Sequence, residues 1–198
     1  MPTQAGNPGS GRVNQKARTR AAILAAVQEL TRAGAELTMP AVARGALVSE
    51  ATAYRYFPDL PSLLAEADTE AWPDPAQALA PVADSDDPVE RIGYAAEFLL
   101  TGILARQSMV RAMMAAAITR PDLAARRPGH RFALIDLALA PLAGADPAEL
   151  TQLKQALAVV MGAEALFVLT DLCGLPPAGA VASAVRTARS LTAAVARP

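Results

Sequence analysis

An all-α fold with about nine helices is predicted for this chain, on three observations in its sequence. The composition is 53% hydrophobic but only 4% aromatic, and Ala, the strongest helix former, supplies most of the excess. Apolar residues recur at helical spacing, while β-branched residues are few outside short runs. No segment has the alternating pattern of a strand. The core should therefore consist of closely packed aliphatic helix faces.

Residues 16–58 are predicted to form a small helical domain that follows a disordered tail over residues 1–15. Gly34 is placed to end the first helix, and the hydroxyls of Thr38 and Ser49 can cap the second and the third. These helices should cover, in order, residues 16–33, 39–46 and 49–57.

Residues 59–198 are predicted to form a second, larger helical domain. Asp59 can cap its first helix, which should end near Trp72. Pro141 should kink or end the helix that follows a polar connector over residues 126–131. The remaining helices should cover about residues 89–106, 109–119, 147–172 and 178–196.

Charge is unevenly divided between these two parts, although the net charge of the whole chain is only −1. Residues 1–58 contain seven Arg or Lys and three Glu, so they are basic, whereas residues 59–198 are acidic. This division favours a polyanion-binding module attached to a body that avoids polyanions.

The segment from Thr38 to Phe57 has the organisation of a helix-turn-helix DNA-binding unit, two short helices joined by a tight turn. Val42 and Ala43 lie on the inner face of the first of these helices, and Val48 fills the turn. The second helix, capped by Ser49, should present to the nucleic acid Glu50, Ala51, Thr52, Tyr54, Arg55 and Tyr56.

These side chains have the chemistry of DNA contacts. Hydroxyl groups, including those of Tyr54 and Tyr56, can bond phosphate oxygens, whereas Arg55 can pair with phosphate or guanine. Ala51 can touch a thymine methyl group, so Arg55 and Ala51 are the candidates for base contact. The four cations Arg12, Lys16, Arg18 and Arg20 belong either to a solvated tail or to an arm that follows the DNA backbone or minor groove.

The segment from Thr19 to Phe57 resembles the N-terminal signature of the TetR family of transcriptional regulators. The residues that carry the resemblance are Thr19-Arg20, Ile23-Leu24, Ala26, Leu30, Gly34, Thr38, Val42-Ala43, Ala46, Val48-Ser49, Thr52, Tyr54 and Tyr56-Phe57. Its most specific part is the ending Thr-x-Tyr-x-Tyr-Phe, preceded by Val-Ser.

Three positions depart from that pattern. The family usually has Gly where Leu47 stands, because the turn needs a positive φ, and a Leu there should carry about 1–2 kcal/mol of strain. It usually has an aromatic residue at the position of Thr31 and a Lys at that of Leu60. The absent Lys removes one phosphate contact.

The resemblance implies a repressor that binds a palindromic operator in double-stranded DNA as a homodimer and leaves it when a small-molecule effector binds. The DNA-binding residues that it implies, with the two basic residues before them, are Arg18, Arg20, Thr38, Ser49, Glu50, Ala51, Thr52, Tyr54, Arg55 and Tyr56.

The resemblance further implies an effector cavity and a dimer interface within residues 59–198. The cavity would suit a largely apolar molecule, and its candidate lining residues, which could instead be core filler, are Trp72, Tyr94, Phe98, Met109, Met113 and His130. The interface would be a four-helix arrangement of the last two helices of each protomer, through Leu153, Leu157, Val160, Met161, Val181, Val185, Ala188 and Leu191.

Other classes of protein find little support in the sequence. The sequence contains neither a Gly-rich phosphate loop nor a nucleophile motif, so it gives no support for an enzyme, and we expect no cofactor. His130 with Cys173 is too small a ligand set for a zinc site, so we expect no metal. With one cysteine, no export signal at the start and no long apolar run, we expect a cytoplasmic protein without membrane contact. The alternative function is a helical small-molecule-binding or scaffold protein whose helix-turn-helix no longer binds DNA, favoured by Glu50 and by the missing Lys at Leu60.

Overall fold

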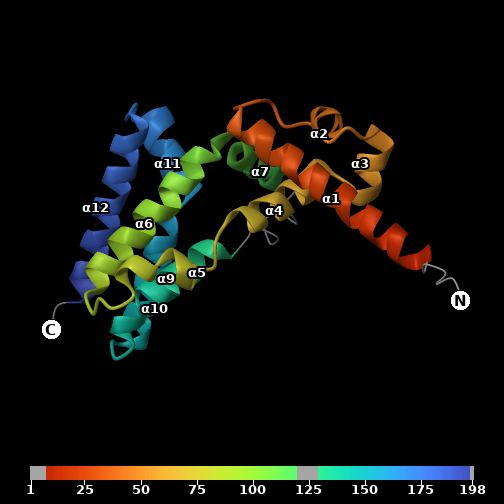
Figure 1. Ribbon diagram of the computed structural model, residues 1–198. Helices are drawn as coiled ribbons and strands as arrows, with labels where there is room; N and C mark the ends of the chain where they lie inside the picture. Colours follow the sequence, from red (N-terminus) through yellow and green to blue (C-terminus); the bar gives the residue numbers. More distant parts are fainter. Residues whose placement is uncertain (1–7, 120–128, 197–198) are drawn as a thin grey trace, which may run out of the picture. The chain divides into compact units, whose positions relative to one another are not determined.

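The computed structural model describes residues 8–119 and 129–196, and every regular element in these ranges is a helix (Figure 1). The predicted all-α fold is therefore confirmed. Two compact units divide the chain. Of the described residues, the first takes in 8–70 and 111–119, and the second 71–110 and 129–196.

The first unit is built on a helix-turn-helix. Its elements are α1 (Pro8–Arg32), α2 (Met39–Gly45), α3 (Glu50–Tyr56), α4 (Leu60–Ala71) up to Glu70, and the part of α7 (Gln107–Thr119) that begins at Arg111. Helix α2 packs between α1 and α3. The buried side chains that join them include Ile23, Val27, Val42, Ala53, Phe57 and Leu63.

Helix α1 begins at Pro8, so the prediction that the chain is a disordered tail up to residue 15 is wrong for residues 8–15. Proline is well tolerated in the first turn of a helix, since its missing N–H would have no partner there. Good helix formers such as Lys16 and Ala17 then let an existing helix propagate toward the N-terminus at little cost. The first seven residues of the predicted tail lie outside the described residues.

Hydrogen bonds confirm two of the predicted helix ends, the end of α1 and the start of α4. Gly34 has φ +64°, and the backbone N–H of Ala35 donates to the carbonyl of Leu30 over 2.9 Å, which closes the C-terminal end of α1. The carboxylate of Asp59 accepts from the backbone N–H of Ser62 over 2.8 Å at the start of α4.

The turn between α2 and α3 contains the left-handed residue that the family resemblance implies. Leu47 has φ 55°, and it is the only non-glycine residue with positive φ in the described part of the chain. Its N–H donates to the carbonyl of Arg44, and the N–H of Val48 donates to that of Ala43. The side chain of Leu47 is 93% exposed, so no packing compensates the backbone strain.

The second unit is a bundle of longer helices with short helical turns between them. Helix α6 (Pro88–Ala105) packs along α12 (Pro177–Val195) and against α9 (His130–Ala138). Helix α10 (Pro147–Val160) packs against both α12 and α9. The short elements are α5 (Pro75–Ala78), η1 (Ala80–Val82), η2 (Ala140–Leu142), α11 (Ala163–Phe167) and a π-helical turn, η3 (Val168–Leu172).

The prediction of one unbroken helix over residues 147–172 is wrong. The chain leaves α10 at Met161 and Gly162 and continues as α11 and η3, bent by 44°. Gly162 is extended, with φ −127° and ψ 164°. Arg131 occupies the break, where it donates to the carbonyl of Ala158 over 2.8 Å and pairs with Glu164 over 2.9 Å. A Cβ on residue 162 would come within 2.7 Å of that guanidinium group, so the glycine leaves the room that Arg131 fills.

Arg91 is a second structural arginine that the sequence gives no reason to single out. It is buried in α6, and its guanidinium group donates to carbonyls of Val82, Ala83 and Ser85 on one side and of Leu137 and Ala138 on the other. These carbonyls lie at the ends of η1 and α9, where helical partners are missing. Arg91 thus ties two helix ends to α6.

No single helix in the described residues is long and apolar enough to cross a membrane; α10 together with α11 and η3 meets that length and composition only as a bent pair.

Candidate nucleic-acid interface

The start of each helix in the helix-turn-helix is fixed by a hydroxyl cap. The Thr38 hydroxyl accepts from the backbone N–H of Ala41 over 3.2 Å at the start of α2. At the start of α3, the Ser49 hydroxyl accepts from the N–H of Thr52 over 3.2 Å and lies 2.9 Å from the Thr52 hydroxyl. These caps satisfy N–H groups that have no helical partner and so set the direction in which α3 begins.

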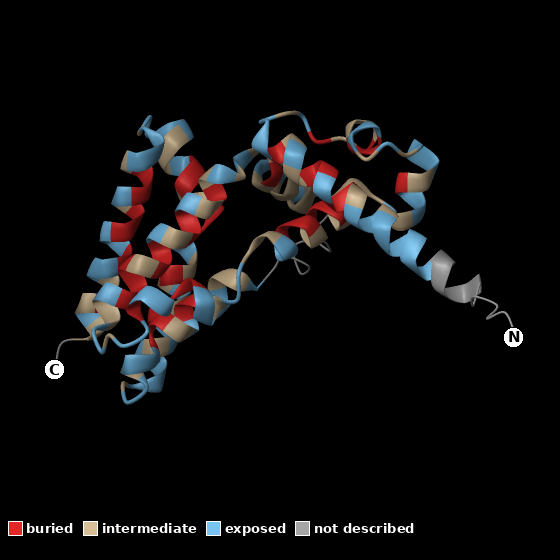
Figure 2. Ribbon diagram, in the orientation of Figure 1, coloured by how far each residue is buried: buried red, intermediate tan, exposed pale blue. Residues whose placement is uncertain are grey.

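Helix α3 has one face buried and one face open (Figure 2). Ala53 within the helix and Phe57 at its C-cap are buried against the rest of the first unit. The exposed residues of the helix, in order, are Glu50, Ala51, Tyr54 and Arg55, with Thr52 and Tyr56 half-buried. Four of the residues predicted to contact DNA, Glu50, Ala51, Tyr54 and Arg55, therefore lie together on the open face of α3.

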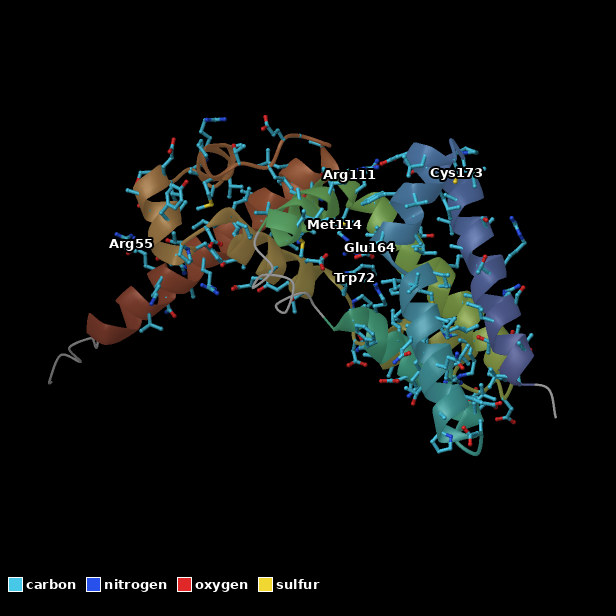
Figure 3. All side chains as sticks on the ribbon, turned by 180° about the vertical axis from the view of Figure 1, so that it is seen from behind. Arg55, Trp72, Arg111, Met114, Glu164 and Cys173 are labelled. Carbon is cyan, nitrogen blue, oxygen red and sulfur yellow. The ribbon has the colours of Figure 1, made fainter. Side chains whose placement is uncertain are left out.

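Arg55 extends from the last turn of α3 toward solvent (Figure 3). Its guanidinium carbon lies 5.8 Å from the centre of the Tyr56 ring, close enough for an attraction between cation and ring. Within the described residues its hydrogen-bond donors have no other partner, so they can meet a base edge or a phosphate.

The two basic residues predicted on α1 have different surroundings. Arg18 is exposed. Arg20 pairs with Glu66 of α4, and its guanidinium carbon lies 4.7 Å from the centre of the Phe57 ring. Because Glu66 is 46 residues away, no local pattern in the sequence could reveal this pairing. Arg20 fastens α1 to α4 and to the end of α3.

Three of the residues predicted to line an effector site meet in the second unit. The ring of Trp72 lies 5.8 Å from that of Phe98, edge to face, and 4.9 Å from that of His130. Arg106, which the sequence did not single out, lies with its guanidinium carbon 3.8 Å from the centre of the Trp72 ring. It also donates to the carbonyl of Ala71. We call these four side chains the Trp72 cluster.

Within that cluster, the surroundings of His130 favour its neutral form. Burial lowers its pKa below the ordinary value of 6.5, the nearby Arg106 lowers it further, and Asp74 opposes them. Its Nε2 atom is buried and has no hydrogen-bond partner in the described part of the chain. A buried nitrogen without a partner costs free energy that a bound molecule with a matching group could recover.

The other predicted lining residues lie elsewhere. Tyr94 of α6 is half-buried, and Met109 is fully buried in the second unit. Met113 is half-buried in the part of α7 that belongs to the first unit. Their contact with an effector stays a prediction.

The residues predicted for the dimer interface lie mostly in the interior of the second unit. Those buried within the single chain are Leu153, Leu157, Met161, Val181, Val185 and Ala188, while Val160 and Leu191 are half-buried. Their apolar faces join α10 to α12 and α12 to α6. Their contact with a second copy stays a prediction. The large apolar side chains that α10 and η3 expose are Val159, Val168 and Leu172.

Among the described residues there is no group of three or more His, Cys, Asp or Glu that could hold a metal ion.

Comparison with known families identifies the helix-turn-helix. Residues 22–67 match the family model described as bacterial regulatory proteins, tetR family. No curated protein matches the chain. The matched range begins inside α1 and ends inside α4, so it contains the whole capped helix-turn-helix and its buried Ala53 and Phe57. The match over residues 22–67 therefore supports a DNA-binding transcriptional regulator of the tetR type, with its helix-turn-helix in the first unit.

Proposed function

We propose that this regulator binds a palindromic operator as a homodimer, represses transcription from it, and is released by a small, largely apolar molecule. The observation that carries the proposal is the open face of α3, where four exposed side chains follow a serine cap. A homodimer with two-fold symmetry presents two copies of that helix to major grooves about 34–36 Å apart, and hence reads an inverted repeat.

Roles along α3 follow from chemistry. Arg55 and Ala51 contact bases, through guanine acceptors and a thymine methyl group, while the hydroxyl of Tyr54 binds a phosphate. Glu50 stands at the N-terminus of α3, where it can accept a hydrogen bond from a cytosine amino group.

The experiment first selects a duplex from a random library with the wild-type protein. Each variant is then titrated against the selected duplex and against a duplex of scrambled sequence. Arg55→Ala and Ala51→Gly should each lose about 1–3 kcal/mol of discrimination between the two duplexes. Tyr54→Phe should weaken binding to both alike. The roles are refuted if Tyr54→Phe alone changes the preferred sequence. If no duplex is enriched and binding is independent of salt, the chain is instead a helical binding or scaffold protein with a degenerate helix-turn-helix.

We place the effector contact at the Trp72 cluster. Its aromatic rings offer a flat apolar surface, and the unpartnered Nε2 of His130 offers one polar handle, which favours an apolar molecule with a single hydrogen-bonding group. Trp72 is the only tryptophan of the chain, so its fluorescence reports on this site alone.

A screen of such molecules should find one that changes Trp72 fluorescence and releases the selected duplex at the same concentration. His130→Phe should lower the affinity of the protein for that molecule at least tenfold. The affinity for DNA, measured without the molecule, should be unchanged. A molecule that releases DNA without any change at Trp72 would place the effector site elsewhere.

A further inference from the structure

The half of α1 that precedes Ala22 lies outside the matched family range, and it is flanked by two hollows. The first hollow, about 490 Å³, separates α1 from the end of α3 and is lined by Gln15, Lys16, Thr19, Arg20, Arg55 and Tyr56. The second, about 660 Å³, separates α1 from the turn of the helix-turn-helix and is lined by Asn14, Gln15, Arg18, Thr19, Ala22, Ala46 and Val48. The helix therefore stands between two open grooves that both border DNA-contact elements.

The spacing of side chains on α1 directs Lys16 and Arg20 into the first groove and Arg18 into the second. Gln15 and Thr19, one helical turn apart, line both hollows. Lys16 lines only the first and Arg18 only the second. Neither Lys16 nor Arg18 pairs with a carboxylate in the described part of the chain, and both are exposed.

The remaining charge in the first groove is also positive. Arg55 lines its opposite wall. Arg20 lines it too, and the one carboxylate that Arg20 meets, Glu66, does not line the hollow. A cleft with cations and no carboxylate on its walls attracts a polyanion.

Helix α1 is held firmly enough to position these cations. Arg20 fixes it to Glu66 and Phe57, while the side-chain amide of Gln28 donates to the carbonyl of Ala67 in α4 over 2.8 Å. The hydroxyl of Thr19 already donates to the carbonyl of Gln15, so Thr19 shapes the groove, and the side-chain amide of Gln15 has no partner among the described residues.

We propose that the first half of α1 is a second DNA-backbone-binding element, in which Lys16 and Arg18 hold phosphate groups on the two sides of the helix. The proposal rests on the proposed function, since it adds backbone contacts to the operator complex. Lys16 would hold a phosphate beside the base that Arg55 contacts from the opposite wall. Contacts of this kind supply affinity and register and carry no sequence information.

The test measures how the affinity for DNA depends on salt. In a homodimer each substitution removes two contacts. Lys16→Gln should therefore reduce the magnitude of the slope of log affinity against log salt concentration by about two. Lys16→Gln with Arg18→Gln should lower it by about four. Both variants should weaken binding to the selected and the scrambled duplex equally. Lys16→Arg should have the slope of the wild type.

The matched control is Arg32→Gln. Arg32 is an exposed cation at the other end of the same helix, paired with Glu29, and its removal changes the net charge equally. Its salt slope should equal that of the wild type. Thermal unfolding of all variants should coincide, because the substituted side chains are exposed.

The possible outcomes separate this proposal from the function that it rests on. If the wild type binds with a steep salt dependence and the double variant keeps that slope, the α1 contact is refuted and the regulator remains. If Lys16→Gln changes the preferred sequence and not the slope, α1 reads bases, which also overturns the proposal. If the wild type shows no salt-dependent binding to any duplex, both are overturned.

Discussion

Leu47 shows how one residue can be unsuited to its backbone and still be tolerated. A φ of 55° brings the Cβ atom of an L-residue close to the following carbonyl, and a side chain that is 93% exposed regains nothing by packing. The hydrogen bonds of the turn, from Leu47 to Arg44 and from Val48 to Ala43, hold the residue in this conformation.

Leu47→Gly should therefore raise the free energy of unfolding by about 1 kcal/mol, since relief of strain exceeds the extra freedom of glycine in the unfolded chain. Ala46→Gly is the matched control, because Ala46 has φ −82° and gains nothing from glycine. It should lose about 0.5–1 kcal/mol. Urea unfolding of both variants measures the difference; equal losses would mean that Leu47 is not strained.

His130 makes stability depend on pH in a predictable direction. Its pKa is lowered in the folded protein, first by burial and then by Arg106, so below pH 6.5 the unfolded chain takes up a proton that the folded chain refuses. The contribution of His130 to stability is complete above pH 6.5 and is lost as the pH falls through the folded-state pKa.

Between about pH 7.5 and about pH 5, His130→Gln should thus lose less stability than the wild type does. Urea unfolding of the two proteins at both pH values isolates the histidine from other titrating groups. A variant that loses as much stability as the wild type would show that His130 titrates alike in both states.

At the scale of elements, Gly102 lies where helices pack closely, whereas Gly144 lies in an open turn. Gly102 of α6 approaches the ring of Trp72 so closely that a Cβ would lie 2.5 Å from its Cη2 atom. The ring is rigid and is held between Arg106 and His130, so it has no easy alternative position. At Gly144, in contrast, an added Cβ would meet nothing within 4 Å.

Gly102→Ala should lower the free energy of unfolding by about 1–3 kcal/mol through overpacking, although alanine is the better helix former. It should also change the fluorescence of Trp72, because the ring must leave its contacts with Arg106 and His130. Gly144→Ala should change the free energy of unfolding by no more than about 0.5 kcal/mol and leave the Trp72 spectrum as it is. An unaltered Trp72 spectrum in Gly102→Ala would contradict the close approach.

The break between α10 and α11 is decided by a partner from another helix. Nothing in residues 147–172 except Gly162 interrupts a helical pattern, and one glycine costs only about 1 kcal/mol in a helix. Arg131 of α9 compensates the lost helical hydrogen bonding by donating to the carbonyl of Ala158, and it pairs with Glu164 beyond the break. The kink belongs to the packing of α9 on α10.

At the scale of the whole molecule, the second unit exposes apolar side chains that a single chain does not cover. Val159 is 69% exposed, Val168 48% and Leu172 81%. They lie on α10 and η3, within residues 147–172, one of the two segments predicted to form the dimer. A second copy of the chain would remove them from water, and burial of apolar surface stabilises such an association.

The wild type should therefore be a dimer by light scattering at micromolar concentration, and Val168→Glu with Leu172→Glu should make it a monomer that remains folded. Val13→Glu, at an apolar residue of α1 that is 68% exposed, should leave the dimer intact. A monomeric wild type would refute the dimer, and a double variant that stays dimeric would move the interface away from η3.

The sequence by itself determined what depends on neighbours within a turn or two. The caps at Thr38, Ser49 and Asp59, the left-handed turn at Leu47 and the division of α3 into an open and a buried face all follow from contacts three or four residues apart. Local patterns therefore predicted the helix-turn-helix, the all-α fold and most helix ends.

Only the tertiary structure decided where distant side chains meet. Arg131 reaches Ala158 and Glu164 across 27 and 33 residues, Arg91 reaches Leu137 across 46, and Arg106 reaches Ala71 across 35. An arginine on a helix looks solvated in the sequence, since its partners are carbonyl groups that every residue carries and that packing alone brings near. The Trp72 cluster, the kink at Gly162 and the fastening of α1 by Arg20 thus depend on the packed fold, because long side chains find their partners only there.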